Sequence, residues 1–279
     1  MMKPFESYFK SHDHHRLFYQ EWKGEMGKAK GVLIFVHGLN EHSGRYSNPV
    51  RYFSKRGYTL YLFDQRGHGR SDGLRSHVDS FGHYLKDLDE FTRFVAGREK
   101  GKKIFMVGHS MGGQIVLNYV ARGGTPLAGF VTSSANIQVA LNIPWLKRKL
   151  ALGLSRFVPR LNLAGEIDPK WISRDPEVVR AYKRDPLVSK KISLKLIAEL
   201  LANQEKLPAL APKVRIPGLL LHAGDDHICA REGSEAFYKK MGSKDKQVKI
   251  YDGFYHELFN EFGKEEVFGD MEKWLARHL

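Results

Sequence analysis

Short apolar runs alternate with longer amphipathic stretches along most of this chain. Six runs rich in β-branched and aromatic residues have the composition of buried strands; they cover residues 31–38, 58–64, 103–110, 128–134, 216–224 and 247–253. Helical spacing lies between most of them, at Phe81 to Arg98, Gln114 to Ala121 and Glu232 to Met241. Because the strand runs are apolar throughout, they predict an α/β fold, with a mostly parallel sheet covered by helices on both faces.

Two segments depart from this alternation. The first has HDHH at 12–15 between two strand-like runs, which predicts an antiparallel hairpin on the sheet. In the second, from about Asn136 to Lys206, the pattern is mostly helical, shows no strand run and is interrupted by prolines. We therefore predict a core of residues 1–135 and 207–279, with a helical cap inserted at 136–206.

Composition places the chain among globular proteins. Of its 279 residues, 42% are hydrophobic and 12% aromatic, which is enough to bury a large core. The single cysteine, Cys229, fits a reducing compartment. The first residues lack the apolar region of a signal peptide, and no apolar stretch reaches the roughly 18 residues of a membrane span. We expect a cytoplasmic protein.

The stretch GHSMG at 108–112 is the strongest chemical signal. It fits GxSxG, the strand-to-helix elbow in which small flanking residues permit a strained turn, so that a serine hydroxyl stands above the sheet. An apolar strand run precedes the motif and a helical pattern follows it, as this turn requires. Ser110 is therefore the candidate nucleophile, and Gly108 and Gly112 are the positions that permit the turn.

A serine hydroxyl needs a base to accept its proton and a carboxylate to orient that base. In this architecture the acid and then the histidine follow the serine in chain order, on loops after later strands. The loop after 216–224 contains Asp225 and Asp226, and the loop after 247–253 contains His256. The pattern predicts His256 as the base and leaves the choice between the two aspartates open.

A developing oxyanion needs hydrogen-bond donors. One is expected from the backbone N–H of Met111, directly after the nucleophile, and the other from the loop after an early strand. That loop is HGLNEHSGRY at 37–46, and it predicts the N–H of Leu39 as the second donor. Gly38 allows a close approach of the backbone, and His37 is expected to orient the loop.

Several motifs together resemble one known family. HGLNEHSGRY, FDQRGHGRSDG, GHSMGG, DPL at 185–187, AGDDHIC and YDGFYHE are similar to the monoacylglycerol lipase and lysophospholipase group of the α/β-hydrolases. The resemblance runs from about Phe5 to the C-terminal helix. It implies the α/β-hydrolase fold, serine esterase chemistry without a cofactor, and Asp226 as the acid, because Asp226 is the fifth residue of a pattern similar to HGxxD.

The resemblance also implies a polar pocket for the alcohol part of an ester. Its residues correspond to Glu41, Arg45, His109 and Tyr182. The alternative for Glu41 and Arg45 is that they brace the oxyanion loop. Mammalian monoacylglycerol lipases carry a histidine three residues after the catalytic one, whereas Phe259 stands here, so recognition of glycerol is less secure.

The predicted cap is the more basic part of the chain: residues 136–206 hold 14 Lys and Arg against 7 Asp and Glu, and so carry half of the net charge of +14. Within it, 143–161 combines apolar residues at helical spacing with five basic ones. This pattern suits contact with an anionic membrane, and it equally suits a cap helix that packs on the core and has a solvated basic face. The motifs and aromatic spacing of nucleic-acid binding are absent from the sequence, so we expect no nucleic-acid partner.

These observations predict a serine carboxylic ester hydrolase for single-chain lipids, with monoacylglycerol as substrate and fatty acid and glycerol as products. A lysophospholipase or a broader carboxylesterase is the alternative, and the apolar cap favours an acyl chain over a peptide. HDHH resembles a metal motif in composition, but we expect no metal site, since adjacent histidines on a hairpin tip rarely point at one ion.

Overall fold

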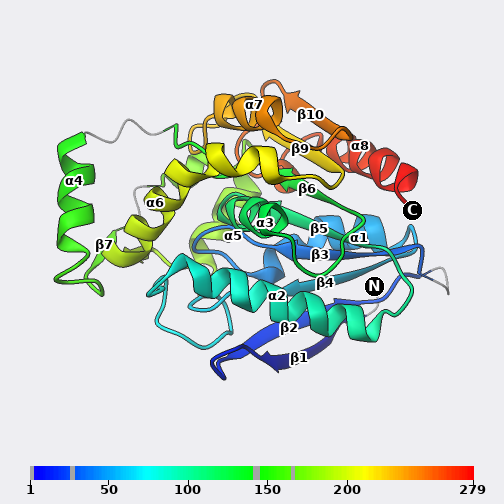
Figure 1. Ribbon diagram of the computed structural model, residues 1–279, viewed down its shortest axis with the longest axis horizontal. Helices are drawn as coiled ribbons and strands as arrows, with labels where there is room; N and C mark the ends of the chain where they lie inside the picture. The colour runs from blue at the N-terminus through cyan, green and yellow to red at the C-terminus, as the bar shows by residue number, and fades with distance from the viewer. Residues whose placement is uncertain (1–2, 26–28, 141–144, 165–166) are drawn as a thin grey trace.

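The computed structural model describes residues 3–25, 29–140, 145–164 and 167–279, with side chains omitted at 145–148. An eight-stranded sheet in the order β1-β2-β4-β3-β5-β6-β9-β10 forms its centre (Figure 1). The strands of this sheet are β1 (Phe5–Lys10), β2 (Arg16–Trp22), β3 (Gly31–Val36), β4 (Tyr58–Phe63), β5 (Ile104–His109), β6 (Gly129–Ser133), β9 (Gly218–Ala223) and β10 (Lys246–Tyr251). From β4 to β10 all neighbours are parallel, whereas β1, β2 and β4 pair antiparallel. The predicted hairpin at HDHH is therefore confirmed.

Helices cover both faces of this sheet. The helices among the described residues are α1 (Ser47–Ser54), α2 (Phe81–Arg98), α3 (Met111–Arg122), α4 (Trp145–Leu154), α5 (Pro176–Arg184), α6 (Leu194–Leu210), α7 (Arg231–Lys240) and α8 (Lys264–Arg277). One core lies under α2, α3, α6 and α7, and the other lies under α1 and α8. Alternate residues of β3 enter different cores: Ile34 faces the first and Phe35 the second. Burial on both faces explains why the sequence shows continuous apolar runs.

The parallel strands end at one common edge. The chain leaves β3 at His37, β5 at Ser110, β9 at Gly224 and β10 at Asp252. Loops after parallel strands meet at this edge, which is where open α/β sheets place their binding sites. The candidate residues from four distant parts of the sequence are brought together in this way.

The segment between β6 and β9 contains α4, α5, α6 and a second, two-stranded sheet. In that sheet β7 (Asn162–Ala164) pairs antiparallel with β8 (Lys191–Ser193). The expectation that this region holds no strand was wrong, because three-residue strands are too short to leave an apolar run in the sequence. The cap limits 136–206 stay a prediction, and α6 continues past them to Leu210.

The amphipathic stretch at 143–161 is helical over only part of its length. Residues 143 and 144 lie outside the described residues, and α4 ends at Leu154, so that Phe157 and Leu161 follow in turns. In Figure 1, α4 lies at one end of the molecule, beyond α6 and away from the sheet. None of the described helices has the length and apolar character needed to cross a bilayer.

Candidate active site

Ser110 occupies the turn between β5 and α3. Its backbone has φ 51° and ψ −118°, a strained conformation that a non-glycine residue rarely adopts. Backbone hydrogen bonds hold this turn: the Ser110 N–H donates to the Ser133 carbonyl, and the Ser110 carbonyl accepts from Asn136, both at 3.0 Å. The chain thus fixes the serine directly from the end of a buried strand.

The flanking glycines are required by space. A Cβ on Gly108 would come within 2.6 Å of the Gly112 carbonyl oxygen, and a Cβ on Gly112 would overlap the Val36 carbonyl oxygen. Both obstacles are backbone atoms, which cannot rotate away as a side chain can. The turn therefore excludes any larger residue at positions 108 and 112.

His256 and Asp226 form a buried pair. His256 Nδ1 lies 2.7 Å from Asp226 Oδ2, while Asp226 Oδ1 accepts the N–H groups of Ile228 and Cys229 at 2.8 and 2.9 Å. Because a carboxylate only accepts, Nδ1 carries the proton and Nε2 is left as the basic atom. Asp225 is exposed to solvent, so the structure brings Asp226, not its neighbour, to His256.

Electrostatics set the charge of this pair. Burial opposes the charged imidazole, but the negative charge and hydrogen bond of Asp226 outweigh it and raise the pKa of His256 above 6.5. Burial also disfavours the carboxylate, yet His256 and His222 hold the pKa of Asp226 well below its usual value. The His256 ring lies 4.7 Å from the His109 ring, next to the elbow. A base with a raised pKa therefore lies beside His109, the residue directly before Ser110.

The loop after β3 lies over the elbow. A Cβ on Gly38 would be 3.2 Å from the Ser110 Cβ, and Leu39 lines the same cavity as Ser110. Met111 is buried as the first residue of α3. The two predicted oxyanion donors thus belong to the two segments that flank Ser110.

Glu41 supports this loop from within. Its Oε1 accepts the Gly38 N–H at 2.6 Å and the Tyr46 hydroxyl at 2.8 Å, and its Oε2 accepts Arg45 at 3.0 Å. All of these partners are parts of the protein. The geometry therefore favours a bracing role for Glu41 over direct contact with an alcohol.

Arg45 is bound mainly by a residue that the sequence analysis missed. Its guanidinium makes a two-point ion pair with Glu257, at 2.6 and 2.8 Å, and lies over the Tyr182 ring at 4.7 Å. Glu257 directly follows His256 in the sequence, and this position could have marked it as a site residue. Its ion pair with Arg45 could not be predicted, because Arg45 lies far earlier in the chain. The ion pair fastens the histidine loop to the oxyanion loop.

The cap is hydrogen-bonded to the same oxyanion loop. Asp185, in the DPL motif, accepts from His42 Nε2 at 2.9 Å, because His42 Nδ1 already accepts the Gly44 N–H. A second link joins the Ser189 N–H to the Asn40 carbonyl at 3.0 Å. Cap and catalytic edge are therefore connected at two adjacent points.

An apolar cavity of about 680 Å³ lies between the core and the cap. Leu39, Asn40 and Ser110 line its inner end. Its apolar walls are mainly from the cap: Leu150, Leu154, Leu161, Leu163, Ile167, Val188, Ile192, Leu194, Ile197, Leu200 and Leu201. The volume falls within the range of small-molecule sites.

The residues implied by resemblance for an alcohol pocket do not all reach this cavity. Tyr182 lines it, whereas Glu41, Arg45 and His109 are not among the residues that line it. His109 Nδ1 donates to the Ser133 carbonyl at 3.1 Å, and burial lowers its pKa to about 4, so it stays neutral. Phe259 is buried in an aromatic cluster that includes Tyr46.

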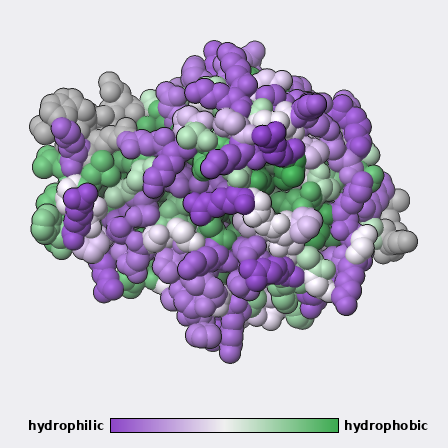
Figure 2. Space-filling model, viewed as in Figure 1, coloured by the Kyte–Doolittle hydropathy of each residue, from purple (hydrophilic) through white to green (hydrophobic). Residues whose placement is uncertain are grey.

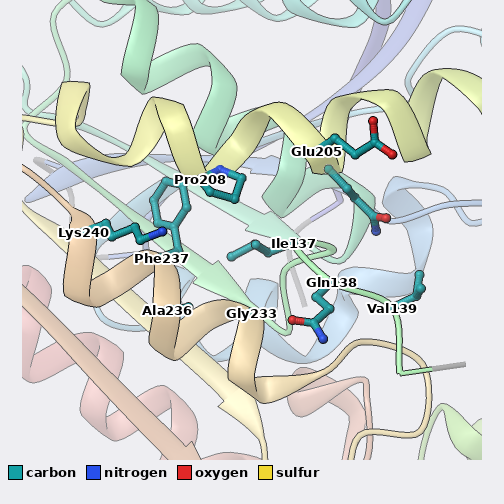
Figure 3. Close-up of a pocket in the computed structure, with 10 residues that line it drawn as sticks. Ile137, Gln138, Val139, Glu205, Pro208, Gly233, Ala236, Phe237 and Lys240 are labelled. Atoms are coloured by element: carbon teal, nitrogen blue, oxygen red, sulfur yellow. The ribbon is translucent and has the colours of Figure 1, made fainter.

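A second cavity, of about 250 Å³, lies beside the first (Figure 3). The segment after β6 and the helices α6 and α7 form its walls, with Phe237 and Lys240 on α7. Val139 and Gln204 line both cavities, but Ser110 lines only the larger one. The larger cavity is therefore the candidate substrate site.

Comparison with known proteins adds an independent line of support. Residues 27–263 match the family described as serine aminopeptidase, S33. A monoacylglycerol lipase of Mycolicibacterium smegmatis is 31% identical over 95% of this chain and 94% of its own length. The crystal structure of a soluble variant of Saccharomyces cerevisiae monoglyceride lipase, in complex with a substrate analog, superposes with a TM-score of 0.91. That structure is 29% identical in sequence and covers 100% of this chain and 96% of its own.

Relatives differ in length. An uncharacterized abhydrolase domain-containing protein of Dictyostelium discoideum is 36% identical over 90% of this chain, but the chain spans only 27% of that protein. The matched region thus occurs both by itself and as one part of a much longer polypeptide.

Proposed function

The chain belongs to the serine aminopeptidase S33 family of α/β-hydrolases, and from this premise we propose that it hydrolyses single-chain lipid esters, above all monoacylglycerols. One observation carries the proposal. Ser110, fixed in a strained strand-to-helix turn, lines an apolar cavity of about 680 Å³ between the core and the cap. A cavity of this kind accepts an acyl chain and presents its ester carbonyl to a nucleophile.

In the proposed reaction Ser110 Oγ attacks the acyl carbonyl, and His256 Nε2 accepts the proton. Asp226 holds the imidazole and stabilises its positive charge, as the 2.7 Å contact supports. The N–H groups of Leu39 and Met111 stabilise the oxyanion. His256 then returns the proton to the leaving alcohol, and water releases the fatty acid from Ser110. Only groups of the chain and water take part in these steps.

The cavity favours an ester over the substrate suggested by the family description. An aminopeptidase must bind a positively charged α-amino group, which calls for a carboxylate. None of the described residues that line the larger cavity is an aspartate or a glutamate. Lys183 and Lys190 line it instead, and both are cationic. A peptide amino terminus would have no counter-charge there.

The same two lysines favour a second candidate, a lysophospholipase. A phosphate on the alcohol part of the ester would find a cationic partner in Lys183 or Lys190. Hydrolysis of a monoacylglycerol and of a lysophospholipid with the same acyl chain, measured side by side, separates the two candidates. A higher kcat/KM for the lysophospholipid would overturn our first choice. Activity on neither would overturn the lipid esterase assignment.

We also propose that the cap contacts a lipid surface. Leu150, Leu154, Leu161 and Leu163 line the cavity and are yet 40–55% exposed, so the cavity reaches an apolar patch of surface. Phe157 is 84% exposed beside them. Figure 2 shows hydrophobic residues gathered at the end of the molecule where α4 lies. An acyl chain can pass from a membrane to such a mouth with little exposure to water.

Two matched substitutions test the lipid contact. Phe157→Ala should weaken binding to phospholipid vesicles several-fold, because an exposed aromatic side chain inserts favourably at a membrane interface. Phe262→Ala removes an aromatic side chain that is 51% exposed outside the cap and should leave binding unchanged. Turnover of a short water-soluble ester should be the same in both. Equal vesicle binding of the two variants contradicts the proposed contact.

A further inference from the structure

A cluster of metal-ligand type lies outside the active site, where the β1–β2 hairpin meets α2. His12 and Asp13 belong to the hairpin tip, and His83 belongs to the first turn of α2. His12 Nε2 is 3.0 Å from His83 Nδ1, and Asp13 Oδ2 is 3.7 Å from each of these nitrogens. Among the described residues, this is the one group of three such side chains whose ligand atoms converge. HDHH resembles a metal motif in composition, but the contribution of His83 was not predictable, because His83 lies far along the chain from HDHH.

We propose that His12, Asp13 and His83 bind one divalent transition-metal ion, with zinc(II) as the ion that best fits two imidazoles and one carboxylate. A point equidistant from the three atoms lies about 2.0 Å from each, which is the length of a zinc–nitrogen or zinc–oxygen bond. Tetrahedral coordination places ligand atoms about 3.3 Å apart, so adjustments of about 0.3 to 0.4 Å suffice. Water fills the fourth position.

A buried carboxylate orients the first ligand. Asp87 Oδ1 lies 3.2 Å from His12 Nδ1, and the Asp87 side chain is 1% exposed. Both Asp87 oxygens accept hydrogen bonds from Arg66, so Oδ1 acts as an acceptor towards His12 as well, which places the His12 proton on Nδ1. The Nε2 lone pair then faces His83 and Asp13. A carboxylate behind a ligating histidine is the usual arrangement in metal sites.

The two carboxylate oxygens of Asp13 have different hydrogen-bond partners. Oδ1 receives the Ser11 hydroxyl, His15 and one Arg66 nitrogen, whereas Oδ2 receives the other Arg66 nitrogen and faces the two histidines. A carboxylate oxygen has two lone pairs, so Oδ2 retains one for an ion. These contacts fix the ligand before the ion arrives, which reduces the entropy lost on binding.

The charge balance favours a dication. Asp13 and Asp87 bring two negative charges and Arg66 brings one positive charge, so the cluster is negative while both imidazoles are neutral. The side chains of His12, His83 and Asp13 are 18%, 31% and 30% exposed, so an ion enters directly from solvent.

An ion at this place ties the hairpin to α2, because its ligands come from both elements. A metal ion that binds the folded chain but not the unfolded chain raises the unfolding temperature, and the rise increases with metal concentration. The site is independent of the ester chemistry, since none of its residues lines either cavity. Its presence or absence is therefore tested without reference to activity.

The experiment is a titration of the full chain, stripped of metal with a chelator, with zinc(II) by calorimetry and with cobalt(II) by absorption spectroscopy. We expect one zinc ion per chain, visible cobalt bands of tetrahedral type, and a rise in the unfolding temperature. His12→Gln and His83→Gln should each weaken zinc binding tenfold or more, since each removes one of three ligands. His14→Asn is the control, because His14 lies exposed on the same hairpin with φ 68°, a backbone conformation that asparagine tolerates.

Two results would overturn the proposal. The first is no zinc uptake by the unsubstituted chain at about 100 µM zinc(II), a concentration far above the dissociation constant of a structural zinc site; the two histidines would then form only a hydrogen-bonded pair. The second is uptake with the same affinity in His12→Gln, His83→Gln and His14→Asn, which would assign the ion to another site.

Discussion

The hydroxyl of Ser110 contributes little to packing and, in our proposal, everything to the first covalent step. We expect Ser110→Ala to lower kcat for a soluble ester to below about a thousandth of the wild-type value, as loss of a triad member does. The unfolding temperature should stay within the error of the wild-type value, because the strained backbone is held by its own hydrogen bonds. Residual kcat above that level would remove Ser110 from the role of nucleophile.

Asp226 and its neighbour provide a matched pair of substitutions. Asp226→Asn should lower kcat by about 10⁴-fold, because an amide opposite His256 Nδ1 favours the wrong tautomer. Asp225→Asn should leave kcat near the wild-type value, since that side chain is exposed. Steady-state kinetics of both purified variants check this, and similar losses in the two would contradict the assigned carboxylate.

The raised pKa of His256 predicts the pH dependence of kcat/KM. Catalysis needs the neutral imidazole, and a raised pKa keeps the ring protonated to a higher pH. The acid limb of the profile should therefore have its midpoint above 6.5, the ordinary value. In Asp226→Asn, where burial acts without the carboxylate, the pKa of His256 measured by NMR should fall below 6.5. A midpoint below 6.5 in the wild type would contradict the electrostatic argument.

Residue identities in the site were predictable to different degrees. GHSMG predicts Ser110 as the nucleophile, because the turn restricts which residues fit and the restricted positions are neighbours in the sequence. The choice of Asp226 rested on resemblance, and the structure explains it by burial beside His256. The partner of Arg45 escaped prediction, because an ion pair between distant loops leaves no local pattern.

At the scale of elements, the elbow is a packing constraint as well as a catalytic device. Gly112→Ala should lower the free energy of unfolding by about 3 kcal/mol or more, because its Cβ overlaps the Val36 carbonyl oxygen in a close-packed interior. Gly97→Ala is the control, since nothing lies within 4 Å of a Cβ there on α2. That change should stabilise the chain by up to about 1 kcal/mol, through helix propensity alone. Denaturant unfolding measures both, and equal values would refute the steric argument.

Sheet elements were predictable and cap elements were only partly so. The core strands are buried on both faces, and for this reason they require long apolar runs that are visible in the sequence. Strands β7 and β8 are three residues long and are held together by backbone hydrogen bonds. Such short pairing requires no side-chain pattern that could be recognised in the sequence. The early end of α4 shows the same limit, since apolar spacing continued beyond the helix to Leu161.

At the scale of the whole molecule, the net charge of +14 governs encounters with anionic surfaces. Replacing Lys147, Arg148 and Lys149 with Gln removes three charges from α4, each worth about 1 kcal/mol next to an anionic membrane. Binding to anionic vesicles should fall sharply and become less sensitive to salt, because such attraction is screened within about a Debye length. Turnover of a soluble ester should persist. Unchanged vesicle binding at low salt would reject electrostatic docking of the cap.

The position of the cap within the sheet order also has a consequence for folding. Strands β6 and β9 are hydrogen-bonded neighbours, yet residues 134–217 separate them along the chain. During synthesis the edge of β6 stays unpaired until this whole segment has been made, and His256 follows later still. Closure of so long a loop is slow, and until it occurs the unpaired backbone N–H and C=O groups of β6 can pair with other chains and cause aggregation. Residues 218–279 therefore supply both the missing neighbour of β6 and the Asp226–His256 pair, so a nascent chain cannot assemble this site before they have been made.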